Sequence, residues 1–380
     1  MKPNSWMCYQ SSNFHCHRLG FRDTPLISNG SMNSTEDDFL SRNGIFTFSS
    51  VVKLLMCVMV AVVSLVGNII VVFVVFTTKK MQTNTYLLIV NMSFSDLLYT
   101  VIAVPPMVTG ILGHPFSVHG HLGTFICKFM NAMAFGLIAS SVLTLAAIAY
   151  DRFFAIVFPL RKLKIQTYLK RIIISIWICS TLVMSPMLYA MRLYEDNNTS
   201  FCYEDWSPYF DTNKASQTYT VTLFIVIYLI PFITMLILYS LISHFLWFRK
   251  IPGNGNETTR RRVIASRRKV IRMLITIVLC FILCWLPLQI VTFSVYFGNV
   301  ELPYDFFFVS EFLIRANGAI NPMIYAAFNE SFRSGFKRFL CCKAGNSQSA
   351  ARTNLLSLTS SKHSNHNNVK RKLLHKETQI

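Results

Sequence analysis

Charged side chains are scarce in this chain of 380 residues, at 14% of the total, against about 25% in an ordinary globular domain. Hydrophobic residues make up 53%. A soluble domain needs more charge to cover its surface, so this composition argues against the common soluble classes. It predicts a membrane protein.

Charge is missing above all from long stretches of the chain. Residues 54–78 contain no charged side chain, and residues 81–127 contain only Asp96. Runs of about twenty apolar residues cross a bilayer as helices, because lipid offers no partner for exposed N–H and C=O groups. We predict an all-α membrane protein, a seven-transmembrane helix bundle followed by a short amphipathic eighth helix. The spans lie at about 54–78, within 81–127, and at 122–157, 168–191, 215–248, 264–298 and 303–328.

Basic residues are nearly absent from every second connection between these spans. They gather after the first span, between the third and fourth, and before the sixth, at 79–80, 161–171 and 260–269. Basic loops stay in the cytosol, which predicts a multi-pass plasma membrane protein with an extracellular N-terminus and a cytoplasmic C-terminus. The net charge of +19 therefore indicates topology and attraction to anionic membrane lipid, not nucleic-acid binding.

Signatures of catalysis are missing as well. The chain has no phosphate-cradling glycine loop and no zinc-type spacing, and its histidines are scattered, so we predict neither an enzyme nor a cofactor. A transporter or channel would show repeated halves or a charged path across the midplane. Neither is visible, and this class stays an unfavoured alternative.

Polar segments flank the predicted bundle. Residues 1–46 contain no apolar run of signal-peptide length and form a predicted extracellular glycosylated tail. Residues 47–328 form the bundle, 329–342 the amphipathic helix and 343–380 a disordered cytoplasmic tail. Glycosylation sequons on the outer side begin at Asn29, Asn33, Asn197 and Asn198.

The juxtamembrane segment alternates phenylalanine with basic residues, which is typical of a helix lying on the inner leaflet. Cys341 and Cys342 follow it directly, where cytosolic cysteines are often palmitoylated. The chain as given ends with Thr378 two residues before Ile380, a pattern that fits a PDZ-domain scaffold and also arises by chance.

Polar residues inside the spans are costly in lipid and need a partner or a function. Asp96, Ser141, Asn317 and Asn321 occur on three different predicted spans. They could form a structural hydrogen-bond hub, or one carboxylate among neutral oxygens could hold a sodium ion. On the outer side, Cys127 and Cys202 face an oxidising environment and can close a disulfide.

Short motifs follow one another in a fixed order along the spans. They are Gly67-Asn68, Asp96, Asp151-Arg152-Phe153, Trp177, Pro231 with Tyr239, Cys284-Trp285-Leu286-Pro287, and Asn321-Pro322-Met323-Ile324-Tyr325. Together with the paired cysteines they resemble the rhodopsin-like (class A) G-protein-coupled receptors. The resemblance implies a receptor that couples an external ligand to a heterotrimeric G protein and whose phosphorylated tail is read by arrestin.

The resemblance also implies a set of activation switches. Prolines weaken and bend helices, and Asp151 can hold the Arg152 guanidinium at rest. The switch residues are Asp151, Arg152, Tyr239, Trp285, Pro287, Asn321, Pro322 and Tyr325. Arg267 replaces the acid that restrains the matching arginine in some relatives, which predicts raised basal activity.

The ligand class is argued from single positions. Ala134 stands where amine receptors carry Asp, and Arg315 stands where opsins carry the retinal Lys, so amines and retinal are disfavoured. Acidic residues gather on the predicted outer side and favour cationic ligands. The segment Cys202-Tyr203-Glu204-Asp205-Trp206 resembles loops of RFamide- and orexin-like neuropeptide receptors.

We therefore predict a receptor for a cationic or amidated neuropeptide. The candidate ligand contacts are Glu204, Glu311, Arg315, Gln289, Asn131, Phe307 and Trp285. Glu311 and Arg315, four residues apart, could instead form a purely structural pair. A lipid or other small-molecule ligand is the alternative, because Phe307 and its neighbours could line an apolar entrance.

Overall fold

The computed structural model describes residues 48–112, 118–158, 165–196, 199–248, 257–298 and 302–340. Several predicted modification and partner sites lie outside these residues and stay predictions: Asn29, Asn33, Asn197, Asn198, Cys341, Cys342, Thr378 and Ile380. Residues 334–380 form a separate unit, of which Ser334–Leu340 is described as the continuation of a helix.

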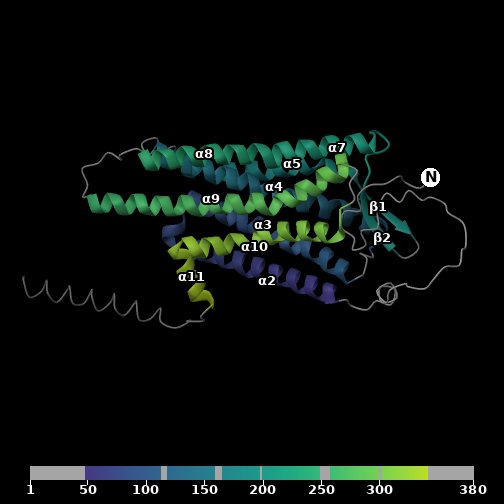
Figure 1. The fold of residues 1–380 in the computed structure, drawn as a ribbon, viewed down its shortest axis with the longest axis horizontal. Coiled ribbons are helices and arrows are strands. Elements are labelled where there is room, and N and C mark those ends of the chain that lie inside the picture. Colours follow the sequence, from purple (N-terminus) through teal and green to yellow (C-terminus); the bar gives the residue numbers. More distant parts are fainter. Residues whose placement is uncertain are drawn as a thin grey trace, which may run out of the picture. The chain divides into compact units, whose positions relative to one another are not determined.

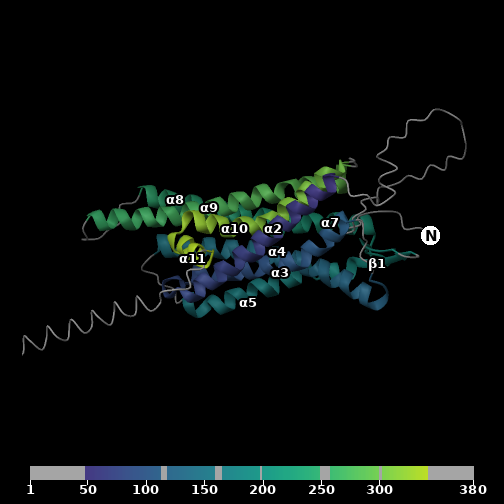
Figure 2. The ribbon, with the colours of Figure 1, turned by 90° about the horizontal axis from the view of Figure 1, so that it is seen from below.

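The main unit is a bundle of long helices that lie side by side (Figures 1 and 2). In chain order its helices are α2 (Phe48–Thr77), η1 (Lys79–Met81), α3 (Asn84–Ile111), α4 (Gly120–Val157), α5 (Ile165–Met184), α6 (Pro186–Ala190), α7 (Thr212–Leu223), η2 (Phe224–Leu229), α8 (Ile230–Phe248), α9 (Glu257–Phe293), η3 (Ser294–Gly298) and α10 (Tyr304–Phe328). The helix α11 (Glu330–Leu340) begins in this unit. Helix α4 packs against α3, α5 and α8, and α10 packs against α2 and α9.

Six helical segments among the described residues are long and apolar enough to cross a membrane: Phe48–Thr77, Asn84–Ile111, Gly120–Val157, Tyr168–Ala190, Thr212–Leu246 and Arg267–Gly298. They match the first six predicted spans, and the second of them ends well before residue 127. Helix α10 is not in this set, since it carries Asp305, Glu311 and Arg315. Its assignment as a span depends on its motif, as expected from the sequence.

Polarity is arranged inside out relative to a soluble protein. Large apolar side chains such as Leu55 and Met59 on α2 are 59% and 63% exposed, whereas Asn68 on the same helix is fully buried. An apolar exterior is what hydrocarbon requires, and the buried polar groups face one another in the interior.

Helices α2 and α10 approach closely at Gly67. A Cβ atom added to Gly67 would lie 2.8 Å from Cβ of Pro322. The adjacent Asn68 donates to the carbonyl oxygen of Gly318 at 3.0 Å. The glycine thus permits the contact, and the asparagine holds it.

A two-stranded antiparallel sheet was not expected. Strands β1 (Met191–Asp196) and β2 (Thr199–Glu204) pair with Leu193 opposite Cys202. This hairpin lies at one end of the bundle (Figure 1), called the hairpin end below; the opposite end is called the Arg152 end.

Two π-helical turns, η2 and η3, were also not predicted. Segment η2 directly precedes Ile230 and Pro231. Proline lacks the N–H that an α-helix would use one turn earlier, and wider turns of this kind recur at such breaks. Segment η3 extends α9 toward the hairpin end and carries Tyr296.

Candidate functional site

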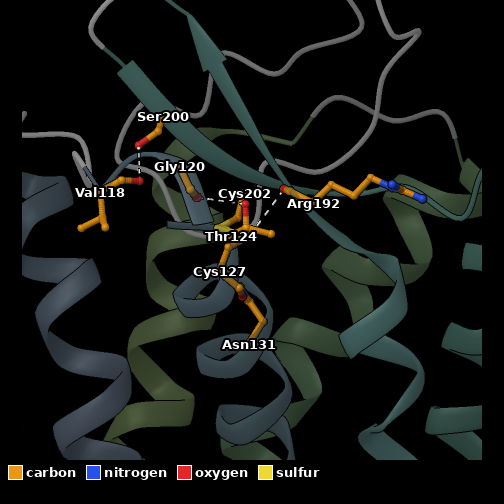
Figure 3. Close-up of a disulfide and its surroundings, with 8 residues drawn as sticks. All are labelled: Val118, Gly120, Thr124, Cys127, Asn131, Arg192, Ser200 and Cys202. Carbon is orange, nitrogen blue, oxygen red and sulfur yellow. Dashed lines mark hydrogen bonds between the residues drawn. A yellow bond between two sulfur atoms is a disulfide. The ribbon is translucent and has the colours of Figure 1, made fainter. Parts of the chain in front are cut away.

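A disulfide joins the hairpin to the bundle. Cys127 on α4 is bonded to Cys202 on β2, with their Cα atoms 5.8 Å apart, which confirms the predicted pairing. The backbone N–H of Gly120 also donates to Oε1 of Glu195 at 2.6 Å, and the Ser200 hydroxyl donates to the carbonyl of Val118 at 3.4 Å. These contacts fix the hairpin over the end of α4 (Figure 3).

The segment after β2 is held by Asp205. Its carboxylate accepts hydrogen bonds from the backbone N–H of Ser207 at 2.9 Å, the Ser207 hydroxyl at 2.8 Å and the Thr212 hydroxyl at 2.9 Å. It also pairs with Arg192 at 3.3 Å. Partial burial raises the pKa of Asp205, but the three hydrogen bonds and the Arg192 charge outweigh it and keep the pKa below its usual value.

Glu204 is buried below the hairpin. Because side chains alternate along a strand, Glu204 and Cys202 share the face of β2 that meets the bundle. The indole N–H of Trp206 donates to Glu204 Oε1 at 2.6 Å, and the Tyr296 hydroxyl donates to Oε2 at 2.9 Å. Glu204 thereby links the hairpin to η3 at the end of α9.

A cavity lies below this link, with about 950 Å³ of empty space that is partly open to solvent. Three methionines and several aromatic rings line it, and its polar side chains include Asn131, Glu204 and Gln289. Trp285 also lines the cavity and stacks on Phe281 with ring centroids 5.6 Å apart. Four of the seven predicted ligand contacts thus share one cavity.

The remaining three candidates, Glu311, Arg315 and Phe307, lie on α10 and do not line this cavity. Arg315 is 7% exposed and pairs with Glu311 at 2.6 Å. Its Nε also donates to the carbonyl of Ala103 on α3 at 3.3 Å. The contacts favour the structural interpretation of the pair, while a role of these three residues in ligand binding stays a prediction.

The polar cluster in the middle of the bundle is centred on Asp96. The Ser141 hydroxyl donates to its Oδ1 at 3.2 Å, and the Asn321 amide donates to its Oδ2 at 3.0 Å. No hydrogen bond joins Asn317 to Asp96 in the part of the chain that the structure describes. This geometry suits the hydrogen-bond hub and leaves the sodium alternative open.

At the Arg152 end, the Arg152 guanidinium binds its neighbour Asp151 at 2.6 Å. The Thr85 hydroxyl of α3 also donates to that carboxylate. Tyr239 and Tyr325, two of the predicted switch residues, are buried, and Tyr325 stacks on Phe332 with centroids 5.3 Å apart. The ion pair expected from the motif is present, and its role as a restraint of the resting state stays a prediction.

Two contacts that sequence reasoning missed hold the same end of α9. Arg268 donates to the carbonyl of Leu246 on α8 at 3.0 Å. Lys269 forms a salt bridge with Glu330 at 2.9 Å. The run of basic residues was interpreted as a topology signal, and nothing in its spacing indicates which partners its members choose.

Comparison with known proteins places these features in context. A model of the family described as 7 transmembrane receptor (rhodopsin family) matches residues 67–325. The substance-P receptor of Aquarana catesbeiana is 31% identical over 282 residues, which cover 73% of this chain and 67% of that receptor. The tachykinin-like peptides receptor 99D of Drosophila melanogaster is 35% identical over 324 residues, covering 80% of this chain and 61% of that receptor. The QRFP-like peptide receptor of Branchiostoma floridae is 30% identical over 334 residues, covering 82% and 85%.

Proposed function

Because the chain belongs to the rhodopsin family of seven-transmembrane receptors, we propose that it binds a peptide at the hairpin end and activates a heterotrimeric G protein at the Arg152 end. The chain is a multi-pass plasma membrane protein. The observation that carries the peptide proposal is the cavity below the hairpin, with buried Glu204 at its wall. The similar receptors named above are peptide receptors by name.

The proposed orientation places the hairpin end outside the cell. Lys79 and Lys80 after α2 and Arg268 in the first part of α9 lie at the opposite end (Figure 1), and basic loops are retained in the cytosol. A peptide would reach the cavity from outside, and the G protein would meet Arg152 from inside.

The proposed coupling runs through α9. Trp285 lines the cavity, and Pro287 lies within the same helix two residues later. Proline leaves the helix without one backbone hydrogen bond and lowers the cost of bending. A ligand that binds the bent arrangement better shifts α9, frees Arg152 from Asp151 and favours G-protein binding.

Further roles accompany this proposal. Asp96, Ser141, Asn317 and Asn321 would hold an allosteric sodium ion, and the inner face of α11 would bind membrane lipid. Cys341 and Cys342 would be palmitoylated, and Asn29, Asn33, Asn197 and Asn198 glycosylated. The phosphorylated tail would bind arrestin, and Thr378 with Ile380 would bind a PDZ scaffold.

A lipid or other small molecule is the second candidate ligand, because methionine, aromatic and aliphatic side chains together form most of the cavity wall. The two candidates differ in their need for Glu204. A peptide that presents a cation gains from that carboxylate, whereas a neutral lipid does not.

A screen of short amidated peptides against cells expressing the full chain tests the proposal, with activation of each G-protein class as the readout. We expect at least one cationic peptide to activate, and Glu204→Gln to lower its potency by roughly tenfold or more. Asp305→Asn removes an exposed carboxylate that pairs with Lys53 and serves as the matched control. Activation by neutral lipids alone, unchanged in Glu204→Gln, would refute the peptide proposal.

A further inference from the structure

A buried acceptor atom of a cavity-lining residue has no hydrogen-bond partner among the described residues. Asn131 is 2% exposed, and its amide N–H donates to the carbonyl of Cys127 at 2.8 Å. Its Oδ1 has no hydrogen-bond partner among the described residues. A buried acceptor left unpaired costs free energy, and this residue lines the cavity, so a donor from a ligand would satisfy it.

The disulfide brings this acceptor and Glu204 to the same region. Asn131 lies one helical turn from Cys127 along α4 (Figure 3), and Glu204 follows Cys202 by two residues on the same face of β2. Since Cys127 and Cys202 are bonded, Asn131 and Glu204 lie close along the chain to the same rigid cross-link, and both line the cavity.

Glu204 has hydrogen bonds but no opposite charge. Its two partners, Trp206 and Tyr296, are both neutral donors, so the described residues supply no ion pair for it. A carboxylate that is 7% exposed without a cation is an expensive state, because desolvation is not repaid by attraction. A cation that enters the cavity would repay it.

We propose that Asn131 and Glu204 together bind one cationic group of the ligand that carries several N–H donors, such as a guanidinium. One donor meets the Asn131 Oδ1, and another takes Glu204 Oε2 from the Tyr296 hydroxyl. The indole of Trp206 keeps Oε1. This inference rests on the proposed receptor function and deepens it, since it names the chemistry that the cavity selects.

The exchange at Oε2 has a mechanical consequence. Tyr296 lies on η3, which continues directly from α9, and the Glu204 bond ties this end of α9 to the hairpin. A guanidinium that displaces the hydroxyl breaks the tie. Recognition of the cation and release of the outer end of α9 are therefore the same event.

Two small probes test the chemistry on the purified full-length chain. 2-Phenylethylguanidine carries the cation and a ring suited to the apolar walls, and 2-phenylethylurea has nearly the same shape without the charge. Binding to the folded protein raises its melting temperature, so titration gives an affinity for each. We expect the guanidine to stabilise and the urea to bind at least tenfold more weakly; equal stabilisation, or none by the guanidine, would overturn the inference.

Single substitutions test which protein atoms bind the guanidinium. Asn131→Leu and Glu204→Gln should each weaken guanidine binding by roughly tenfold or more, whereas Asn131→Asp should strengthen it. Tyr296→Phe removes the competing hydroxyl and should tighten guanidine binding severalfold while raising ligand-free G-protein activation. Tyr209→Phe is the matched control, because it also removes a tyrosine hydroxyl, but Tyr209 is 80% exposed and is not among the residues that line the cavity.

The outcomes separate this inference from the proposed function. Unchanged guanidine affinity in Asn131→Leu and Asn131→Asp removes Asn131 from the site, and unchanged affinity in Tyr296→Phe removes the exchange. A chain that binds the guanidine as expected but activates no G protein with any peptide keeps the site and loses the receptor proposal. A chain that a peptide activates but that does not bind the guanidine keeps the receptor proposal and loses the proposed cation site.

Discussion

The buried charge of Arg315 depends on a single partner residue, Glu311, for part of its stabilisation. Arg315 is 7% exposed and its partner Glu311 is 20% exposed, so Glu311→Gln removes the carboxylate that pairs with a buried guanidinium. Breaking a fully buried pair costs about 3–5 kcal/mol. The partial exposure of Glu311 lowers this to roughly 2–3 kcal/mol of unfolding free energy.

The double variant Glu311→Gln/Arg315→Met tests whether the ion pair is the cause of this loss of stability, because it removes the buried guanidinium together with its carboxylate partner. We expect it to melt at a higher temperature than Glu311→Gln alone, measured on purified protein. If the double variant melts at the same or a lower temperature, the pair is not what makes Glu311 important, and its role as a ligand contact gains weight.

Asp205 predicts a pH dependence at the hairpin end. Hydrogen bonds and Arg192 lower its pKa from 3.8 in spite of partial burial. A carboxyl group with a lowered folded pKa contributes stability that is complete above its unfolded pKa and is lost as pH falls through the folded pKa. Below about pH 4, therefore, the melting temperature of the wild-type chain should fall more steeply than that of Asp205→Asn.

Thermal unfolding between pH 7 and pH 3 measures this difference. Asp305→Asn provides the control, since its carboxylate is 80% exposed and should leave the steepness unchanged. Parallel curves for the wild-type chain and Asp205→Asn would show that the Ser207 and Thr212 hydrogen bonds do not stabilise the ionised carboxylate.

At the scale of helices, packing of α2 against α10 depends on the missing side chain of Gly67. Gly67→Ala places a Cβ 2.8 Å from Cβ of Pro322, so one helix must move, and overpacking of this kind costs about 1–3 kcal/mol. We expect a lower melting temperature and weaker surface expression. Gly136→Ala is the control, because its nearest contact would be the Ser180 carbonyl oxygen at 4.0 Å and alanine favours a helix.

Elements could be predicted from the sequence to the extent that hydropathy encodes them. Six spans follow from apolar length alone, whereas α10 needed its Asn321-Pro322 motif because Glu311 and Arg315 lower its hydropathy. The β1–β2 hairpin was missed, since its pairing is set by contacts with α4 and the Cys127 disulfide. The π turns were missed because they differ from an α-helix in the register of the backbone hydrogen bonds, which hydropathy does not encode.

The site was predicted in part for a similar reason. Cys202, two residues before Glu204 in the sequence, placed the carboxylate near the bundle, and Glu204 does line the cavity. The spacing of Glu311 and Arg315 predicted that they meet, but hydropathy does not fix the rotation of α10 about its axis. Whether those residues face the cavity or α3 depends on packing, which the spacing does not contain.

For the whole molecule, basal activity depends on what holds α9 at the Arg152 end. Arg267 cannot restrain Arg152, yet Lys269 bonds Glu330 at 2.9 Å. Exposed pairs contribute little individually, so Lys269→Gln should raise ligand-free G-protein activation modestly. Nucleotide exchange in membranes measures it, and Lys170→Gln removes an equal charge from another exposed position.

If Lys269→Gln and Lys170→Gln raise ligand-free G-protein activation equally, the cause is the loss of surface charge and not the loss of the Lys269–Glu330 salt bridge. Signalling of the wild-type chain no higher than in mock-transfected cells would argue against the raised basal activity expected from Arg267. A rise in Lys269→Gln from such a silent baseline would then identify the Glu330 contact as the substitute restraint.

The polarity of α10 has a consequence for biosynthesis. An arginine near the centre of a span opposes insertion by the translocon by about 2.5–3.5 kcal/mol, and Glu311 adds a second charge to α10, so this segment inserts poorly by itself. Its partners are already in the bilayer when it emerges: Ala103 receives Arg315, Asp96 receives Asn321, and Asn68 reaches Gly318. The earlier spans therefore assist insertion of the last one. If a substitution in α3 removes these contacts, we expect α10 to fail to insert and the chain to be degraded.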